Sequence, residues 1–222
     1  MINKIALAGC GNVGTALLEI LHEKKDELKE KYGFEYKVVL VSDLTKGVVA
    51  NADGIDLAAL LESIAETRTF DKFAHADGSF EELLERSGAT VLAECTPTNL
   101  KTGEPGLSHL RAALSRGISV TTTNKGPIAV AFDELTELAE KNGAKLSYEG
   151  VVMSGTPLID MMKNGMAGCT AIRVEGIVNG TTNFMLTKMA EGTEYGAALA
   201  EAQSLGYARQ TRPATSRAGT RP

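Results

Sequence analysis

The sequence predicts an α/β protein whose first part is a doubly wound, parallel sheet. Short apolar runs alternate with amphipathic stretches over residues 5–148, and a glycine-rich turn follows the first apolar run. At 222 residues the chain has room for one large or two modest domains. Hydrophobic residues make up 43% and charged residues 23%, which permits a sizeable core and excludes wholesale disorder.

The first elements form a strand–helix–strand unit. Residues 5–8 are apolar without polar alternation, which is typical of a strand buried on both faces. Apolar residues then recur at helical spacing from Val13, and the charged end of this helix is expected to stop at Gly33. Residues 36–43 predict the second strand, parallel to the first.

The same alternation continues through the middle of the chain. Further strands are expected at 90–94, 118–122 and 146–148, and helices at 55–66, 79–87, 107–116 and 131–141. An open, doubly wound sheet follows from this order.

The pattern changes from about Pro157. Helices are expected at 158–163, after the Asn179-Gly180 turn and at 193–205, and the β-branched segment 169–178 predicts a strand. These elements cannot close a core alone, so we expect the start of an α+β substrate and dimerisation domain. The predicted division is 1–148, 149–208 and a basic segment at 209–222 that we expect to be disordered.

Charge and cysteine usage exclude several classes of protein. The net charge of −5 argues against general affinity for nucleic acid or anionic membranes. No apolar stretch approaches the ~18 residues of a membrane helix, and the three cysteines are too few and scattered for a disulfide framework. We expect a soluble, cytoplasmic protein.

The motif Gly9-Cys-Gly11-Asn-Val-Gly14 lies between the first strand and the first helix. Gly9 would permit the tight turn, Gly11 would let a pyrophosphate approach the backbone, and Gly14 would allow close helix–strand packing. The N-terminus of the helix offers unpaired N–H groups to phosphates. Because the motif has the strand, the helix and a later acidic residue around it, we favour dinucleotide binding over an ordinary glycine turn.

Asp43 closes the second strand, where a carboxylate would accept hydrogen bonds from an adenosine ribose. A role as a helix cap or loop aspartate is nearly as plausible for this residue. Lys46 would instead meet a 2′-phosphate, so the choice between NAD and NADP stays open at this point.

Three later segments carry polar groups suited to ligands. Lys125 follows a strand and would polarise a substrate carbonyl or alcohol, although a lysine there is more often a solvated loop residue. Glu149 precedes a glycine-rich turn that would hold a hard cation or act as a hinge. Residues 179–183 would bind a small polar substrate or simply form an Asn-Gly turn with a threonine N-cap.

Six segments together resemble the homoserine dehydrogenase family, and the likeness extends to Ala208. They are GCGNVG, ECTPTNLKTGEP, TTTNKGPIA, YEGVVMSGTPLI, GIVNGTTNFMLTKM and EAQSLGYA. The resemblance implies a Rossmann-type domain and an NAD- or NADP-dependent interconversion of L-homoserine and L-aspartate 4-semialdehyde, in threonine, methionine and isoleucine biosynthesis. It also implies a protein that is usually a homodimer.

The resemblance assigns roles to individual positions. It implies cofactor contacts at Gly9, Gly11, Asn12, Val13, Gly14 and Thr96, and a catalytic Lys125 at the boundary between nicotinamide and substrate. It implies a sodium site at Glu149, Val152, Ser154 and Thr156. It also implies substrate contacts at Gly180, Thr181 and Tyr207. Two alternatives remain: a dehydrogenase of the same plan with another small substrate, and a non-catalytic dinucleotide-binding module whose basic segment recruits a partner.

The family pattern is lost after residue 208. The family continues with a glutamate and then an aspartate and a lysine, whereas this chain has Arg209 and a segment with four arginines and no acidic residue. We therefore expect the 222-residue chain to be catalytically impaired.

We expect a reading-frame change at codon 209. Permitted codons for residues 209–222, read two bases later, encode TDPTGDVEGWDAA, which resembles the missing family segment. The nucleotide sequence of the gene tests this expectation, and codons that cannot encode such a segment in another frame would disprove it.

Overall fold

The computed structural model describes residues 2–208, which form two compact units that we treat separately. The first unit ends at Gly165 and the second begins at Met166. The basic segment 209–222, which we expected to be disordered, lies outside the described residues. No helix within residues 2–208 is long and apolar enough to cross a membrane.

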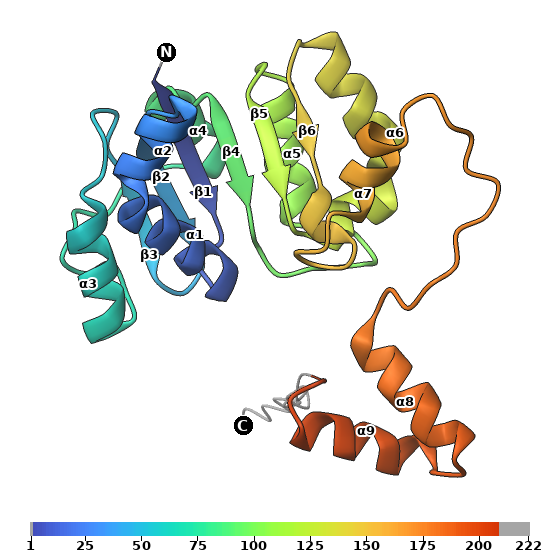
Figure 1. Ribbon diagram of the computed structural model, residues 1–222. Helices are drawn as coiled ribbons and strands as arrows, with labels where there is room; N and C mark the ends of the chain where they lie inside the picture. The colour runs from blue at the N-terminus through green and yellow to red at the C-terminus, as the bar shows by residue number, and fades with distance from the viewer. Residues whose placement is uncertain (1, 209–222) are drawn as a thin grey trace, which may run out of the picture. The chain divides into compact units, whose positions relative to one another are not determined.

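The first unit is built on a six-stranded sheet (Figure 1). Its strands are β1 (Asn3–Ala8), β2 (Tyr36–Asp43), β3 (Gly47–Ala50), β4 (Val91–Glu94), β5 (Ser119–Thr122) and β6 (Leu146–Ser147). Their spatial order is β3-β2-β1-β4-β5-β6, and all neighbours are parallel except β2 and β3. The predicted doubly wound sheet is therefore confirmed, with an antiparallel strand at one edge.

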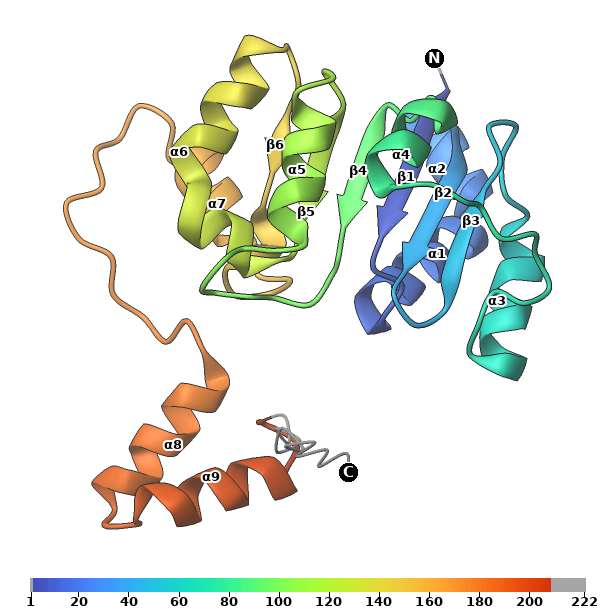
Figure 2. The same cartoon turned by 180° about the vertical axis from the view of Figure 1, so that it is seen from behind.

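Helices cover both faces of this sheet. The α-helices of this unit are α1 (Asn12–Glu23), α2 (Lys25–Tyr32), α3 (Leu57–Thr67), α4 (Phe80–Ser87), α5 (Gly106–Leu114), α6 (Lys125–Lys141) and the short α7 (Leu158–Asp160). Two views from opposite sides show α1 and α3 on one face and α4 and α5 on the other (Figures 1 and 2). This is the layering that parallel sheets require, because each crossover helix buries one face.

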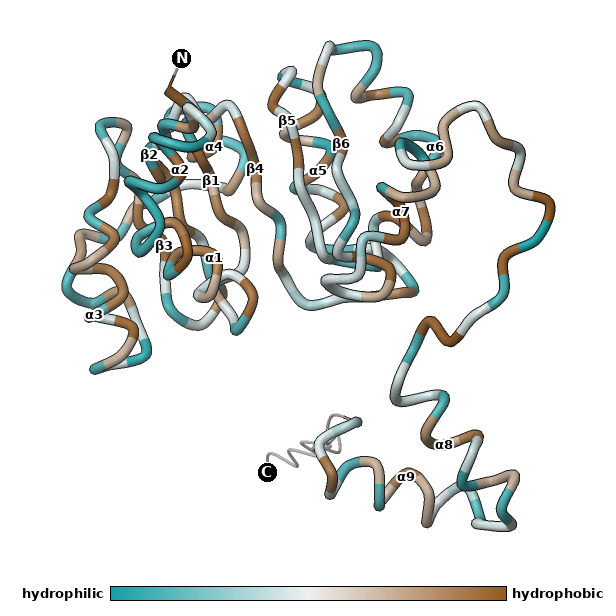
Figure 3. Tube along the Cα trace, in the orientation of Figure 1, coloured by the Kyte–Doolittle hydropathy of each residue, from teal (hydrophilic) through white to brown (hydrophobic). Residues whose placement is uncertain are grey.

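Alternate residues of the strands enter two separate cores. Ile5 and Leu7 of β1 pack with Leu18 of α1 on one face, whereas Ala6 and Ala8 pack with helices α4 to α6 on the other. This alternation explains why residues 5–8 of β1 include no polar position, since both faces of the strand are buried there. In Figure 3 the strands are coloured mostly as hydrophobic, whereas α2, which buries no residue, is mostly hydrophilic.

Local sequence signals set several helix ends. The Asp56 carboxylate accepts the N–H groups of Ala58 and Ala59 and caps α3, and Ser79 with Glu82 forms a capping box at α4. Gly33 ends α2 in the left-handed conformation at φ 62°, as the sequence predicted. The first predicted helix is divided at Lys24 into α1 and α2.

The second unit contains α8 (Gly180–Ala190) and α9 (Tyr195–Ser204). Both helices were expected, but the predicted strand at 169–178 is wrong: this segment has no regular secondary structure, and Ile172 is 98% exposed. A strand requires a neighbour for its backbone hydrogen bonds, and no partner strand pairs with this segment within residues 2–208.

Candidate functional site

The polar loops of the first unit gather at the carboxyl edge of the sheet. The chain continues from β1 to β2 on one side of β1, whereas β4 lies on the other side (Figure 1). The ends of these strands are adjacent, because Ala8 is in register with both Ser42 and Glu94. Open α/β sheets bind ligands outside the carboxyl ends of the strands at this reversal of strand order.

Two glycines of the Gly9–Gly14 motif, one in the loop after β1 and one in α1, are required by packing. Gly9 has φ 87°, and a Cβ atom there would lie 2.6 Å from the backbone of Cys95 and Thr96. A Cβ atom on Gly14 would lie 2.1 Å from the carbonyl oxygen of Gly9. Side chains at these two positions would force β1, β4 and α1 apart, so only glycine allows these elements to pack this closely.

Packing within residues 2–208 does not require a glycine at position 11. A Cβ atom there would meet no atom of these residues within 4 Å, and the φ of −77° suits any residue. The N-terminus of α1 that follows has no side-chain cap and no acidic residue in its first turn. Asn12 and the 53% exposed Val13 begin this turn at the surface. The loop therefore has space and a positive helix end suited to a pyrophosphate.

Asp43 is bonded to the glycine loop. Its Oδ2 accepts the N–H of Cys10 at 2.9 Å, and its Oδ1 accepts hydrogen bonds from Thr45 and from the N–H of Lys46. Burial alone would raise the pKa of Asp43, but these hydrogen bonds outweigh it and lower the pKa. Asp43 is thus ionised at neutral pH, and its stabilising contribution is lost as the pH falls through its depressed folded-state pKa.

A buried cluster connects the ends of β4 and β5. Glu94 is fully buried, and its Oε1 accepts the N–H of Thr96 at 3.0 Å as well as the Thr96 hydroxyl. Its Oε2 accepts the Thr122 hydroxyl at 3.0 Å. The amide nitrogen of Asn124 donates to the Thr96 hydroxyl oxygen at 3.1 Å. Thr96, an expected cofactor contact, is therefore fixed by a carboxylate and an amide.

Lys125 is the first residue of α6, and it is exposed. Asn124 caps this helix by accepting the N–H of Gly126 at 3.1 Å. A cation at a helix N-terminus opposes the helix dipole, so Lys125 is not placed there to stabilise the helix. The structure thus places Lys125 on a helix, three residues after β5 ends, and not in a loop.

The two cysteines at this edge are not suited to nucleophilic catalysis. Burial raises the pKa of the Cys95 thiol to about 11 and also raises the pKa of Cys10. Both side chains are therefore neutral thiols at neutral pH, whereas the reactive form of cysteine is the thiolate.

The segment after β6 lies against the loop that precedes Lys125. A Cβ atom on Gly150 would come within 2.7 Å of the Thr123 side chain. The two oxygens of Glu149 accept the N–H groups of Ile159 and Asp160 at 2.9 and 2.8 Å. Among the described residues, no group of three or more His, Cys, Asp or Glu side chains could hold a metal ion.

Two of the expected substrate residues meet in the second unit. The Thr181 hydroxyl donates to the carbonyl oxygen of Tyr207, and the Tyr207 ring lies 5.1 Å from that of Phe184. Gly180 is the first residue of α8, which is capped by Asn179 rather than by a threonine, through an N–H of Thr182 at 2.8 Å.

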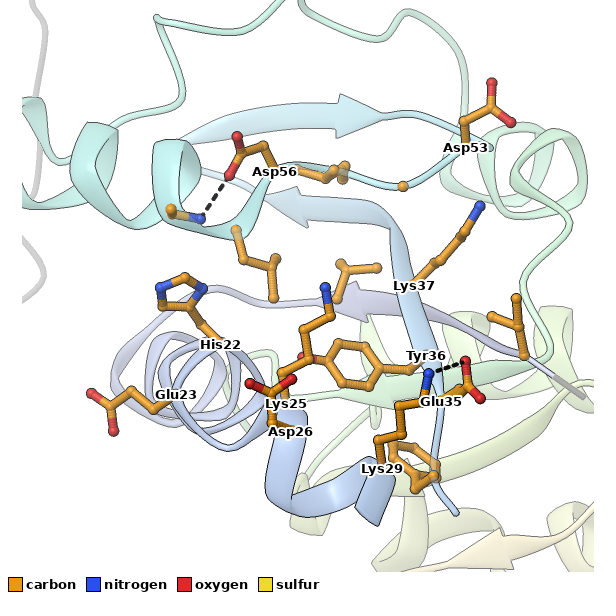
Figure 4. Close-up of a pocket in the computed structure, with 17 residues that line it drawn as sticks. His22, Glu23, Lys25, Asp26, Lys29, Glu35, Tyr36, Lys37, Asp53 and Asp56 are labelled. Atoms are coloured by element: carbon orange, nitrogen blue, oxygen red, sulfur yellow. Dashed lines mark hydrogen bonds and ion pairs between the residues drawn. The ribbon is translucent and has the colours of Figure 1, made fainter. Parts of the chain in front are cut away.

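An open groove of about 770 Å³ lies away from these loops, at the beginning of β2 (Figure 4). Basic and acidic side chains alternate around it, and Lys29 pairs with Glu35 at 3.5 Å. Asp56 already caps α3, and the N-terminus of α2, although it has no side-chain cap, carries Asp26 and Glu27 in its first turn. With these mixed charges the groove suits an anion less well than the glycine loop does, where the first turn of the helix holds no acidic residue.

The strand order, the glycine turn and the acidic end of β2 define the first unit as a Rossmann-type α/β domain. The family model described as "Homoserine dehydrogenase, NAD binding domain" matches residues 9–149, and the model described as "Homoserine dehydrogenase" matches 157–213. The chain belongs to the homoserine dehydrogenase family.

Individual relatives agree with this assignment. The NAD(+)-dependent homoserine dehydrogenase of Pseudomonas canavaninivorans is 43% identical over 92% of this chain and 59% of that protein, and a Methanocaldococcus jannaschii homoserine dehydrogenase is 36% identical. A hyperthermophilic archaeal homoserine dehydrogenase mutant in complex with NADPH superimposes with a TM-score of 0.81 at 33% identity, over 95% of this chain and 63% of that one. The chain spans about 60% of the length of these curated relatives.

Sequence reasoning did not single out the buried cluster. Glu94 is the first residue of the segment ECTPTNLKTGEP, and no motif of the sequence includes His109. The available signal was an acidic residue at the end of an otherwise apolar strand, which is unusual because charged side chains are rarely fully buried.

Two glycine substitutions separate packing from binding. We expect Gly14→Ala to lower the free energy of unfolding by about 2 kcal/mol, because the added methyl group meets backbone. Gly11→Ala should leave this free energy unchanged or raise it by about 0.5 kcal/mol, yet weaken dinucleotide binding about tenfold. Urea unfolding and calorimetric titration measure the two effects. Equal destabilisation by the two variants would contradict the distinction.

Proposed function

We propose that the first unit binds a nicotinamide dinucleotide across the carboxyl edge of its sheet. The observation that carries this proposal is the open space at Gly11 in front of an uncapped helix, between two glycines that packing itself requires. The match to an NAD-binding family model over residues 9–149 supports it.

Each half of the edge takes one half of the ligand in this proposal. Gly9 to Gly14 hold the pyrophosphate, with the backbone N–H groups of Asn12 and Val13 directed at it. The ionised Asp43 accepts a hydrogen bond from the adenosine ribose. Thr96 and Lys125 border the nicotinamide, because β4 to β6 form the second mononucleotide-binding half.

The complete protein, in this proposal, interconverts L-homoserine and L-aspartate 4-semialdehyde. The coenzyme supplies the hydride chemistry, and Lys125 orients or protonates the substrate oxygen. Residues 1–148 serve the coenzyme, and residues 149–208 form part of the catalytic domain. This division is supported by the two family models, which end at 149 and begin at 157.

Gly180, Thr181 and Tyr207 are the substrate contacts of this proposal. Thr181 and Tyr207 are already held together by a hydrogen bond. They lie at the start of α8 and just beyond α9, so both helices contribute to one polar cluster.

We also propose that Glu149, Val152, Ser154 and Thr156 hold a sodium ion. Glu149 and the backbone carbonyls of the other three residues form a set of oxygen donors, which is the kind that hard cations prefer. Met153 and Ser154 have positive φ values of 57° and 55°, which turn the backbone sharply between these donors.

Calorimetric titration of the full chain with NAD⁺, NADH, NADP⁺ and NADPH tests the coenzyme proposal. We expect NADH to bind about tenfold more tightly than NADPH, because the ionised Asp43 repels a 2′-phosphate. Asp43→Asn should reduce this difference. A sample that unfolds cooperatively but binds none of the four coenzymes would refute the proposal.

A further inference from the structure

The buried cluster at the ends of β4 and β5 contains an unusual concentration of polar groups. Five polar or charged side chains are buried within residues 2–208, and Glu94, Thr122 and Asn124 are three of them. Glu94 is the only acidic or basic side chain among the five. An unpaired buried charge is costly, and apolar residues of similar size often stabilise a core better than buried ions do.

Both oxygens of the Glu94 carboxylate accept hydrogen bonds. Thr96 donates its N–H and its hydroxyl to Oε1, and Thr122 donates its hydroxyl to Oε2. His109 of α5 places its Nδ1 3.9 Å from Oε1, and this buried nitrogen has no hydrogen-bond partner in the described part of the chain. The carboxylate thus accepts hydrogen bonds from the loop after β4 and from the end of β5.

The hydrogen bonds continue from Glu94 to the start of α6. The Thr122 hydroxyl accepts the N–H of Asn124 at 3.0 Å, and the Asn124 amide donates to the Thr96 hydroxyl oxygen. Asn124 then caps α6 through the N–H of Gly126. Glu94 therefore sets the position of Thr96 directly and that of Lys125 through Asn124.

The packing leaves little freedom for this arrangement to relax. A Cβ atom on Gly106 would lie 2.5 Å from the Asn124 amide nitrogen and 3.1 Å from Oε2 of Glu94. The start of α5 thus packs closely against the side chains of Asn124 and Glu94, and neither side chain has room to turn toward α5.

We propose that Glu94 is a positioning residue for the nicotinamide half of the site, acting through Thr96 and Asn124. This inference rests on the proposed coenzyme binding. The adenosine half is held by the glycine loop and Asp43, and within residues 2–208 the hydrogen bonds of Asp43 go to Cys10, Thr45 and Lys46 and not to Glu94. Glu94 should consequently affect one half of the ligand and not the other.

The test compares NADH with ADP-ribose, which lacks the nicotinamide, by calorimetric titration of the full chain. We expect Glu94→Gln to weaken NADH binding about tenfold or more, because an amide nitrogen cannot accept the donors of Thr96 or Thr122. The affinity for ADP-ribose should stay within about twofold of the wild-type value.

Thr122 provides a second pair of variants in case Glu94→Gln does not fold. Thr122→Val removes the hydroxyl that bridges Glu94 and Asn124 and should weaken NADH binding selectively, whereas Thr122→Ser keeps the hydroxyl and should restore it. Ser87→Ala is the matched control: it removes another buried hydroxyl, bonded to the Leu84 carbonyl oxygen at 2.7 Å, and should change neither affinity.

The outcomes separate this inference from the proposed function. A folded wild-type chain that binds neither ligand would refute the coenzyme proposal itself. If the wild-type chain binds both ligands, the variants decide the positioning role alone. That role would be refuted if Glu94→Gln or Thr122→Val kept its NADH affinity, or if either variant lost affinity for both ligands equally.

Discussion

The close approach of three backbone segments is the constraint on which the rest of this structure depends. The loop after β1 touches the end of β4, and α1 begins directly over that loop. Only hydrogen atoms fit between these segments, which explains glycine at positions 9 and 14. The result is a narrow edge where the end of a helix, the Asp43 carboxylate and the β4 loop lie close to one another, and each of these features suits a different part of a dinucleotide.

The two halves of this edge are held by different chemistry. The half around the glycines depends on backbone contacts and on Asp43, whose depressed pKa reflects the hydrogen bonds that it accepts. The other half depends on buried side chains around Glu94. A polar network that is almost fully paired is rigid, and pre-organised groups lose less freedom when a ligand binds.

Much of the fold could be predicted because its signals are local. The glycine loop, Gly33 and the buried strands follow from conformational preference and periodicity in neighbouring residues. Strand β3 was not predicted, since a four-residue antiparallel edge strand leaves almost no pattern. The strand expected at 169–178 was wrong because pairing depends on a partner that the local sequence does not reveal. Helix α6 was expected only from residue 131, since Ala131 leaves helical geometry with φ −145° and the apolar pattern restarts there.

The candidate site was predictable to a similar degree. Gly11 lies in a motif of known spacing and Asp43 ends the strand that follows it, whereas the role of Glu94 depends on Thr122 and Asn124, which are 28 and 30 residues away in the sequence. The most direct test of the account is the change in backbone amide NMR shifts when NADH is added to the isotope-labelled full chain. We predict the largest changes at Gly11 to Gly14, Asp43 and Thr96. Changes centred instead on the groove beside Lys25 and Lys37 would contradict the account.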